Sequence, residues 1–241
     1  MSNKKWFYDY ENKCDCSEDD KCGCTFPNNM KHNFDFELEE NQLSAKKKII
    51  QNHLYIGDDA PDFEAAVVTA NNQINKKFSL YNHIEGKYAL LLFYPADFSA
   101  VCPSELIAFN NAYDEFIKRN IKIIAISVDS LHSHVAWKKL PIRDGGVGNI
   151  KIPLVSDINK SICFDYGVLS SEGNAYRSTF IIDNNMKIRY ISANDKRIGR
   201  EVGDILRIVD VLQSLDKNES ICSFGWNENQ LIENQTNYLN K

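Results

Sequence analysis

The sequence predicts an α/β protein with a mixed central β-sheet flanked by helices on both faces. The continuous apolar run at residues 88–94 and the mostly apolar segment 121–128 have the length of strands that are buried in a sheet. Each run precedes a segment with apolar residues at helical spacing, and a hairpin and an amphipathic helix follow later in the chain. The resulting order, β-α-β-α-β-α-β-β-α, is typical of a sheet that is covered on both sides.

A helix is predicted after the first strand, from Cys102 to Arg119. Pro103 suits the first helical turn, where its missing N–H costs nothing. Lys118 and Arg119 complement the negative C-terminal end of this helix. Its apolar residues are Leu106, Phe109, Tyr113, Phe116 and Ile117.

Further elements are predicted after the second strand, 121–128. The glycine-rich stretch GGVG at 145–148 indicates a loop, and DNNM at 183–186 between two apolar segments indicates a hairpin turn. The predicted elements are a helix at 131–139, a loop at 141–148, a strand at 152–155, a helix at 158–166, strands at 178–182 and 187–191, and a helix from about residue 201. The last helix carries one apolar stripe of Val202, Ile205, Leu206, Val209 and Leu212.

Composition and charge argue against several classes of partner. The chain has 241 residues, 43% of them hydrophobic and 25% charged, which is the balance of a globular protein. Its net charge of −5 argues against nucleic acid and anionic membranes, because both attract basic surfaces. No apolar run approaches the ~20 residues that span a bilayer. The first residues lack the apolar core of a secretory signal and include early acidic residues, so a cytoplasmic location is expected.

Three parts of the chain differ in composition. Residues 1–48 are polar and rich in Asn, Asp, Glu and Lys, which predicts a weakly ordered N-terminal extension. Residues 49–226 carry the periodic pattern and form the expected catalytic domain, and 227–241 form a C-terminal tail. An odd number of cysteines without a secretory signal indicates reduced, reactive thiols rather than a disulfide framework. The seven are Cys14, Cys16, Cys22, Cys24, Cys102, Cys163 and Cys222.

Cys102 is the strongest candidate nucleophile. It lies between a buried strand and a helix N-terminus, where unpaired N–H groups and the positive end of the helix dipole stabilise a thiolate. Pro95 and Pro103 stiffen the loop, and Ser99 can place a hydroxyl beside the sulfur. A lone cysteine among apolar residues is usually a buried core thiol, but the position at a strand-to-helix junction favours reactivity.

The segment 93–105, FYPADFSAVCPSE, closely resembles the peroxidatic loop of the peroxiredoxins, which are thiol peroxidases on a thioredoxin-like fold. The resemblance runs from about Leu54 to Trp226. It implies that Cys102 is the peroxidatic cysteine, with Ser99 in the position usually held by Thr and Pro95 shielding the thiolate from solvent. Ala100 replaces an aromatic residue that many members carry.

Three further site residues are implied by the same resemblance. The segment 175–183, AYRSTFIID, resembles the strand that bears the active-site arginine, here Arg177, whose guanidinium would favour the thiolate and polarise the peroxide. The segment 194–200, NDKRIGR, resembles the family's NDLPVGR, which makes Arg200 a second arginine, although Lys196-Arg197 departs from the pattern. Glu105 matches a carboxylate that holds these arginines in place.

Cys222 lies in SICSFGW, residues 220–226, which resembles the resolving-cysteine motif VCPAGW. Spacing alone does not say whether Cys222 comes from the same chain. The resemblance implies a homodimer in which the partner's resolving cysteine forms a disulfide with the peroxidatic one, five dimers that commonly form a ring, and a thioredoxin-like reductant. That cycle needs no metal or flavin. The alternative for Cys222 is a free surface thiol.

The glycine stretch 145–148 resembles the GGLG element of members that are easily inactivated by over-oxidation. That element works with a C-terminal Tyr-Phe pair, whereas this chain has Tyr238-Leu239. The incomplete pair predicts intermediate sensitivity to over-oxidation.

The N-terminal cysteines leave three interpretations open. Four thiolates can hold Zn²⁺ or Cu(I), although zinc sites usually space their pairs as Cys-x2-Cys. Two disulfides pairing across a turn are a second option, and a disordered thiol-bearing tail is the third. The residues concerned are Cys14, Cys16, Cys22 and Cys24.

Rival functions and remaining residues complete the predictions. A disulfide oxidoreductase would need Cys-x-x-Cys, but Ser99 and Glu105 occupy the partner positions. A holdase chaperone or peroxide-signalling scaffold on the same ring-forming fold is the alternative function. Cys163 is expected to be a buried structural thiol, and Trp137 to pack in the core or at a subunit contact. His132 and His134 are assigned neither a partner nor a catalytic role, because their i, i+2 spacing does not share a helix face.

Overall fold

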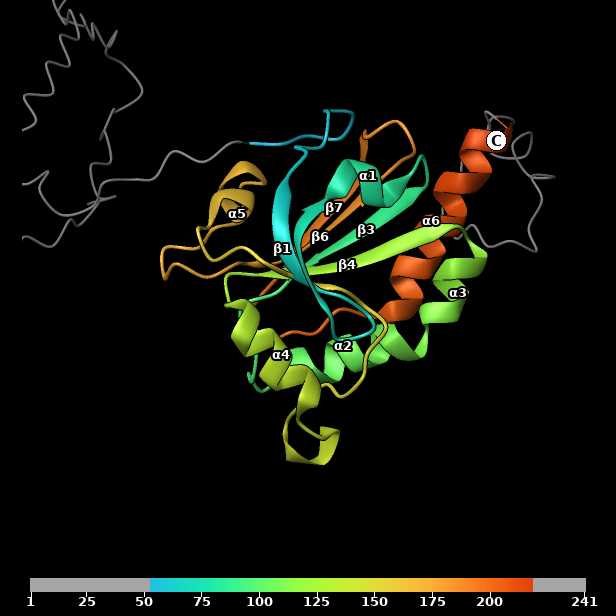
Figure 1. The fold of residues 1–241 in the computed structure, drawn as a ribbon. Helices are drawn as coiled ribbons and strands as arrows, with labels where there is room; N and C mark the ends of the chain where they lie inside the picture. The colour runs from blue at the N-terminus through green and yellow to red at the C-terminus, as the bar shows by residue number, and fades with distance from the viewer. Residues whose placement is uncertain (1–52, 219–241) are drawn as a thin grey trace, which may run out of the picture. The chain divides into compact units, whose positions relative to one another are not determined.

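The two long apolar runs form neighbouring central strands of a seven-stranded sheet with the order β2-β1-β5-β4-β3-β6-β7. The computed structural model describes residues 53–218 (Figure 1). Its strands are β1 Glu64–Val68, β2 Ile74–Ser79, β3 Tyr88–Phe93, β4 Ile121–Ser127, β5 Leu154–Ser156, β6 Arg177–Ile182 and β7 Ile188–Asn194. Its helices are α1 Leu80–Ile84, α2 Cys102–Asn111, α3 Tyr113–Lys118, α4 Leu131–Lys139, α5 Ser161–Asp165 and α6 Val202–Asn218, with a 3-10 turn at Ile142–Asp144.

The sheet is mixed, as predicted. Strand β3 runs parallel to β4, in register from Tyr88 opposite Ile121 to Phe93 opposite Ile126, and β4 runs parallel to β5. On its other side β3 pairs antiparallel with β6, which forms an antiparallel hairpin with β7. The antiparallel pairing of β3 with β6 brings the start of β6 to the carboxyl end of β3, where the candidate nucleophile lies.

Helices cover both faces of the sheet, as predicted. Because side chains alternate along a strand, β3 contributes to two cores. Ala89, Leu91 and Phe93 join a core with α1 and α5, whereas Leu90 and Leu92 join a second core with α2, α3, α4 and α6. Figure 1 shows α2 and α4 packed on the side of the sheet away from α1. Every residue of β3 is buried, as its uninterrupted apolar sequence predicts.

The predicted helix 102–119 is two helices in the structure. Helix α2 ends at Asn111 and α3 begins at Tyr113, because Ala112 leaves helical geometry with φ −89 and ψ 5. Asn110 and Asn111 are weak helix formers, and the Asn110 side chain instead accepts a 2.7 Å hydrogen bond from the Lys151 amide. The break still leaves Phe109 and Phe116 in contact, with ring centroids 6.0 Å apart.

Two other predicted elements are shorter or shifted. The predicted helix 158–166 is reduced to α5, because the Asp157 carboxylate accepts from the amides of Ile162 and Cys163, at 3.1 and 2.8 Å, and fixes a later start. The predicted strand 152–155 is observed as β5. The predicted loop 141–148 is confirmed apart from its 3-10 turn, and Gly146 is required there because a Cβ would collide with the Leu140 carbonyl oxygen.

The pattern missed the first three elements, β1, β2 and α1. Strand β2 is an edge strand whose first four residues are exposed, so its sequence INKKFS shows no alternation of apolar and polar residues. Helix α1 has only five residues, too few for a helical period to be recognised. Among residues 53–218, no helix combines the length and apolar character that a membrane crossing requires.

Candidate active site

Cys102 is the first residue of α2, directly after the loop that leaves β3. Its side chain is fully buried, with an exposed fraction of 0%. The Ser99 hydroxyl accepts a 3.3 Å hydrogen bond from the Cys102 amide, so Ser99 satisfies one of the free N–H groups at the start of the helix. The structure therefore gives the Ser99 hydroxyl a contact with the Cys102 backbone, and its placement beside the sulfur stays a prediction.

Arg177, the first residue of β6, lies against the sulfur. Its Nη2 is 3.5 Å from Cys102 Sγ and also donates to the Lys196 carbonyl oxygen at 2.8 Å. The side chain is 1% exposed. Its Nε is buried and has no acceptor among residues 53–218, which leaves one donor free for a ligand.

Glu105 connects the two arginines, as the resemblance implied. One carboxylate oxygen accepts from Arg177 Nη1 at 2.5 Å and from Arg200 Nη2 at 2.8 Å. The other accepts from the Arg200 backbone amide at 2.7 Å and from Arg200 Nε at 2.8 Å. All three side chains are buried. Two guanidinium charges thus face one carboxylate, and the surplus positive charge lies beside the Cys102 sulfur.

The charge on Glu105 is held by its partners. Burial raises the pKa of a carboxyl group, but the hydrogen bonds and charge of Arg200, together with the charge of Arg177, outweigh it. The pKa of Glu105 is therefore lowered below its ordinary value. Glu105 stays ionised at neutral pH and keeps both guanidinium groups in place.

Arg200 also ties the site to the sheet. Its Nη1 donates to the Ser178 carbonyl oxygen at 2.8 Å, and its guanidinium lies 6.0 Å from the centre of the Phe109 ring. The departures from the family pattern lie on the surface: Lys196 pairs with Glu172 and Arg197 pairs with Asp195. Only the Lys196 carbonyl enters the site, so the changed side chains leave its geometry intact.

Pro95 and Ala100 lie in the loop that joins β3 to α2. Pro95 is half-buried and Ala100 is exposed. Phe98 in the same loop has a left-handed backbone, with φ +54, and is 51% exposed. Shielding of the thiolate by Pro95 stays a prediction.

The expectation that His134 has no partner was wrong. The residue is fully buried, and its Nδ1 lies 2.8 Å from Asp97 Oδ2 while its Nε2 lies 3.3 Å from the Val155 carbonyl oxygen. A signal was present in the sequence: His134 precedes Trp137 by one helical turn, and an i, i+3 pair shares a face. Trp137 is buried in the core, which was one of the two locations predicted for it.

The other thiols fall into two groups. Cys163 is buried, as predicted, and burial followed by the charge of Asp157 raises the pKa of its thiol far above the ordinary value, which disfavours the reactive thiolate. Cys222, Cys14, Cys16, Cys22, Cys24 and the Tyr238-Leu239 tail lie outside the described residues. Within residues 53–218 no three His, Cys, Asp or Glu side chains are grouped to hold a metal ion.

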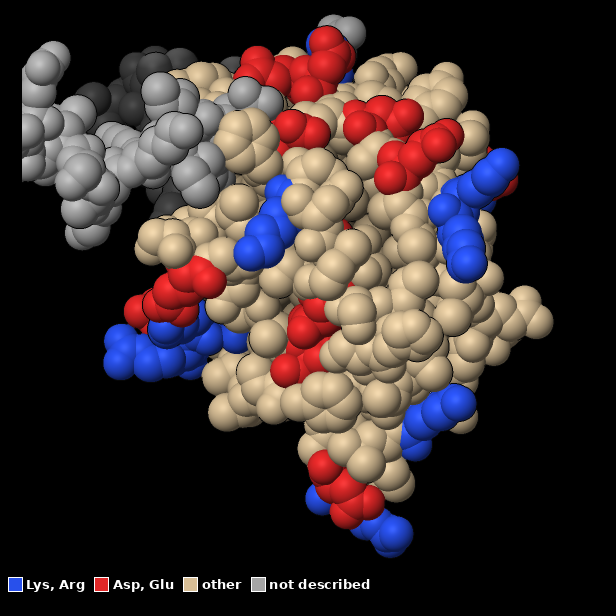
Figure 2. All heavy atoms as spheres, turned by 60° about the vertical axis from the view of Figure 1, so that its left-hand side comes forward, with Lys and Arg blue, Asp and Glu red and all other residues tan. Residues whose placement is uncertain are grey.

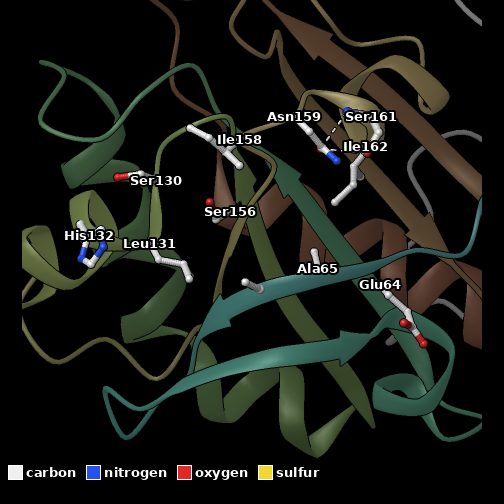
Figure 3. A pocket seen from close by; sticks show the side chains of 11 residues that line it. Glu64, Ala65, Ser130, Leu131, His132, Ser156, Ile158, Asn159, Ser161 and Ile162 are labelled. Carbon is white, nitrogen blue, oxygen red and sulfur yellow. Dashed lines mark hydrogen bonds between the residues drawn. The ribbon is translucent and has the colours of Figure 1, made fainter.

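One cavity on the described part of the chain lies apart from Cys102. A cavity of about 330 Å³ lies between β1, the start of α4 and the start of α5, lined by His132, Ser130, Glu64 and Ile158 among others (Figure 3). None of the residues that contact Cys102 lines it. On the face shown in Figure 2 the charged side chains of both signs are scattered, without a continuous basic patch.

Comparison with known proteins gives a consistent result. The model of the AhpC/TSA family matches residues 56–191. Alkyl hydroperoxide reductase C of Helicobacter pylori is 41% identical over 167 residues, which cover 69% of this chain and 84% of that protein. Peroxiredoxin-1 of Gallus gallus is 47% identical over 174 residues, 71% of this chain and 86% of its own length. The crystal structure of reduced 2-Cys peroxiredoxin from Plasmodium vivax is similar with a TM-score of 0.72 at 42% identity, covering 74% of this chain and 92% of that one.

Proposed function

The chain belongs to the AhpC/TSA family, and on that premise we propose that it reduces hydrogen peroxide and organic hydroperoxides at Cys102. Its relatives are peroxiredoxins and alkyl hydroperoxide reductases, so its enzyme class is that of the thiol peroxidases. The observation that supports the proposal most is the contact of Arg177 Nη2 with Cys102 Sγ inside a buried cluster with a surplus positive charge.

In the first step the Cys102 thiolate attacks one oxygen of the peroxide. The S–O bond forms as the O–O bond breaks, the sulfur is oxidised by two electrons to a sulfenic acid, and the departing alkoxide or hydroxide takes a proton and leaves as alcohol or water. Charge moves from sulfur to the departing oxygen. Arg177 can stabilise this charge at both positions, because the guanidinium contacts the sulfur and its buried Nε is free to donate to a bound oxygen.

In the second step we expect the Cys222 thiol to attack the sulfur of the sulfenic acid. A disulfide forms, water leaves, and a thioredoxin-like dithiol protein then reduces the disulfide and becomes oxidised itself. Cys102 is fully buried, so a second thiol reaches it only after the loop and the first turn of α2 open. The peroxidase cycle therefore needs a closed state for oxidation and an open state for disulfide formation.

The proposed partners rest on the resemblance to the two-cysteine peroxiredoxins. Cys222 of a second subunit would make the disulfide intermolecular, which requires a homodimer, and a ring of dimers is the expected larger assembly. The reductant is a thioredoxin-like protein, and the expected compartment is the cytoplasm, where such reductants maintain thiols.

Peroxide consumption by the full-length protein with thioredoxin and its reductase tests the proposal. Cys102→Ser should abolish turnover, whereas Cys163→Ser, a change at an equally buried thiol, should retain it. Non-reducing electrophoresis after one equivalent of peroxide should give a disulfide-linked dimer that both Cys102→Ser and Cys222→Ser lack. Turnover by Cys102→Ser would refute the assignment, and a dimer that survives Cys222→Ser would refute the resolving role.

A further inference from the structure

The loop that carries Cys102 is hydrogen-bonded to α4 and to the end of β4 through Asp97, and the ring of Phe98 lies 6.0 Å from the ring of Trp137. The Asp97 carboxylate accepts hydrogen bonds from Tyr94 OH at 2.9 Å, from Ser133 Oγ at 2.8 Å and from His134 Nδ1 at 2.8 Å. The Asp97 amide donates to Asp129 Oδ2 at 2.9 Å, just after β4. Asp97 is buried, so these contacts are shielded from water and bind the loop firmly to α4 and the sheet.

His134 is the member of this group that reaches furthest into the protein. It has no exposed surface, and it bridges the Asp97 carboxylate on one side and the Val155 carbonyl of β5 on the other. Because the Asp97 carboxylate accepts hydrogen bonds, Nδ1 of His134 acts as the donor toward it. The imidazole thus links the loop to a strand at the centre of the sheet.

Directly after Asp97 the backbone is strained. Phe98 has φ +54, a left-handed conformation that bulky L-residues rarely adopt. On its other side, Ser99 accepts from the Cys102 amide. The strained residue therefore lies between the anchored Asp97 and the segment that sets the position of the sulfur.

We propose that His134 is a positioning residue that acts through Asp97 and keeps Cys102 in the closed state. The His134–Asp97 contact holds the backbone at Phe98 in its strained conformation, and with it the contact of Cys102 with Arg177. When the contact is lost, Phe98 relaxes, residues 98–101 move and the start of α2 opens.

The catalytic consequence of this inference rests on the proposed peroxidase function. A closed site speeds the first oxidation but delays disulfide formation, and the waiting sulfenic acid can react with a second peroxide. That reaction adds one oxygen, giving a sulfinic acid and one alcohol or water. The strength of the His134–Asp97 contact then sets the balance between resolution and over-oxidation.

Amide hydrogen exchange of the full-length reduced protein tests the contact without any peroxide. His134→Leu should raise exchange in residues 95–104 by about tenfold or more, the effect of losing one hydrogen bond to a charged group. His134→Asn keeps a donor close to the position of Nδ1 and should restore most of the protection. His132→Leu is the matched control, because this exposed residue lies on the same helix and lines the cavity of Figure 3. Amide exchange in residues 95–104 of this variant should equal that of the wild type.

Peroxide experiments then test the consequence. His134→Leu should lower the rate constant for Cys102 oxidation by about tenfold and raise the peroxide dose that gives half sulfinic acid by a similar factor. A general loss of stability would lower the rate constant for Cys102 oxidation without raising the peroxide dose that gives half sulfinic acid. Equal exchange in His134→Leu and wild type, or no rescue by His134→Asn, overturns the proposal.

Ser133→Ala provides a second route if His134→Leu does not fold. It removes another donor to Asp97, and it should shift exchange and over-oxidation in the same direction by a smaller factor. No shift in Ser133→Ala would also overturn the proposal. If the wild-type protein consumed no peroxide but the exchange results held, the proposed function would fail and the positioning role would stand.

Discussion

Cys102 and Cys163 are two equally buried thiols in one domain, and both lie near the start of a helix. Their charged neighbours differ in sign. Cys102 contacts the Arg177 guanidinium, whereas Cys163 lies beside the Asp157 carboxylate, which accepts from its amide at 2.8 Å. Burial first, and then the Asp157 charge, raise the pKa of the Cys163 thiol. The comparison teaches that two thiols buried near helix starts can differ in the sign of the charge beside them.

The cluster around Cys102 depends on Glu105, and removing that charge should have the largest effect on stability. Glu105→Gln leaves two buried guanidinium groups without a carboxylate, and losing one partner of a buried ion pair costs about 3–5 kcal/mol. Chemical denaturation should show this loss. Glu115→Gln is the control, because Glu115 pairs with Lys118 and Arg119 at the surface, and its unfolding midpoint should barely change.

Arg177→Met should remove the charge contact that distinguishes Cys102 from Cys163. It removes the donor at Cys102 Sγ, and the rate of Cys102 oxidation by peroxide should fall by about 10²–10³-fold. Stopped-flow measurement on the reduced protein gives this rate. Arg189→Met is the control, because it removes an arginine on the adjacent strand β7 that pairs with Asp183 and Asp216. The oxidation rate of this variant should stay within about threefold of wild type, a smaller change than the loss of one hydrogen bond to a charged group would cause. Comparable losses in both variants would contradict the assigned role of Arg177.

The pH dependence of stability should carry the signature of Glu105. Its pKa is lowered in the folded protein, so the unfolded chain binds more protons as the pH falls below the ordinary value of 4.5. The stabilising contribution is present above that pH and is lost as the pH falls through the folded pKa. The difference in unfolding free energy between wild type and Glu105→Gln should therefore shrink between neutral and acid pH. A difference that stays constant over this range would contradict the interpretation.

Asp157→Asn, which changes the charge beside Cys163, should have the smallest effect on stability. Asparagine keeps one acceptor for the amides of Ile162 and Cys163 but loses the charge, so a cost of about 1 kcal/mol is expected. Burial remains the first cause of the raised pKa of the Cys163 thiol, so this thiol should still resist a thiol reagent in the folded protein. Rapid labelling of Cys163 in this variant would show that charge, rather than burial, protects it.

Sequence patterns predicted the centre of this fold because its signals are local. An uninterrupted apolar run identifies β3, and Pro103 with the following helical period identifies the helix that begins at Cys102. Strand β2 escaped notice because most of its residues face solvent, and α1 because it is too short. Glu105, Arg177 and Arg200 were found only through resemblance to a family, because no local pattern links residues 72 and 95 positions apart.

By itself the sequence determined that Cys102 lies between a buried strand and a helix N-terminus, because strand burial and helix initiation depend on neighbouring residues. Only the tertiary structure decided which charges meet the sulfur. The antiparallel pairing of β3 with β6 brings Arg177 to Cys102, and the packing of α4 behind the loop gives His134 its contact with Asp97. These contacts join distant segments, and their energies depend on distance and burial, which are properties of the folded chain.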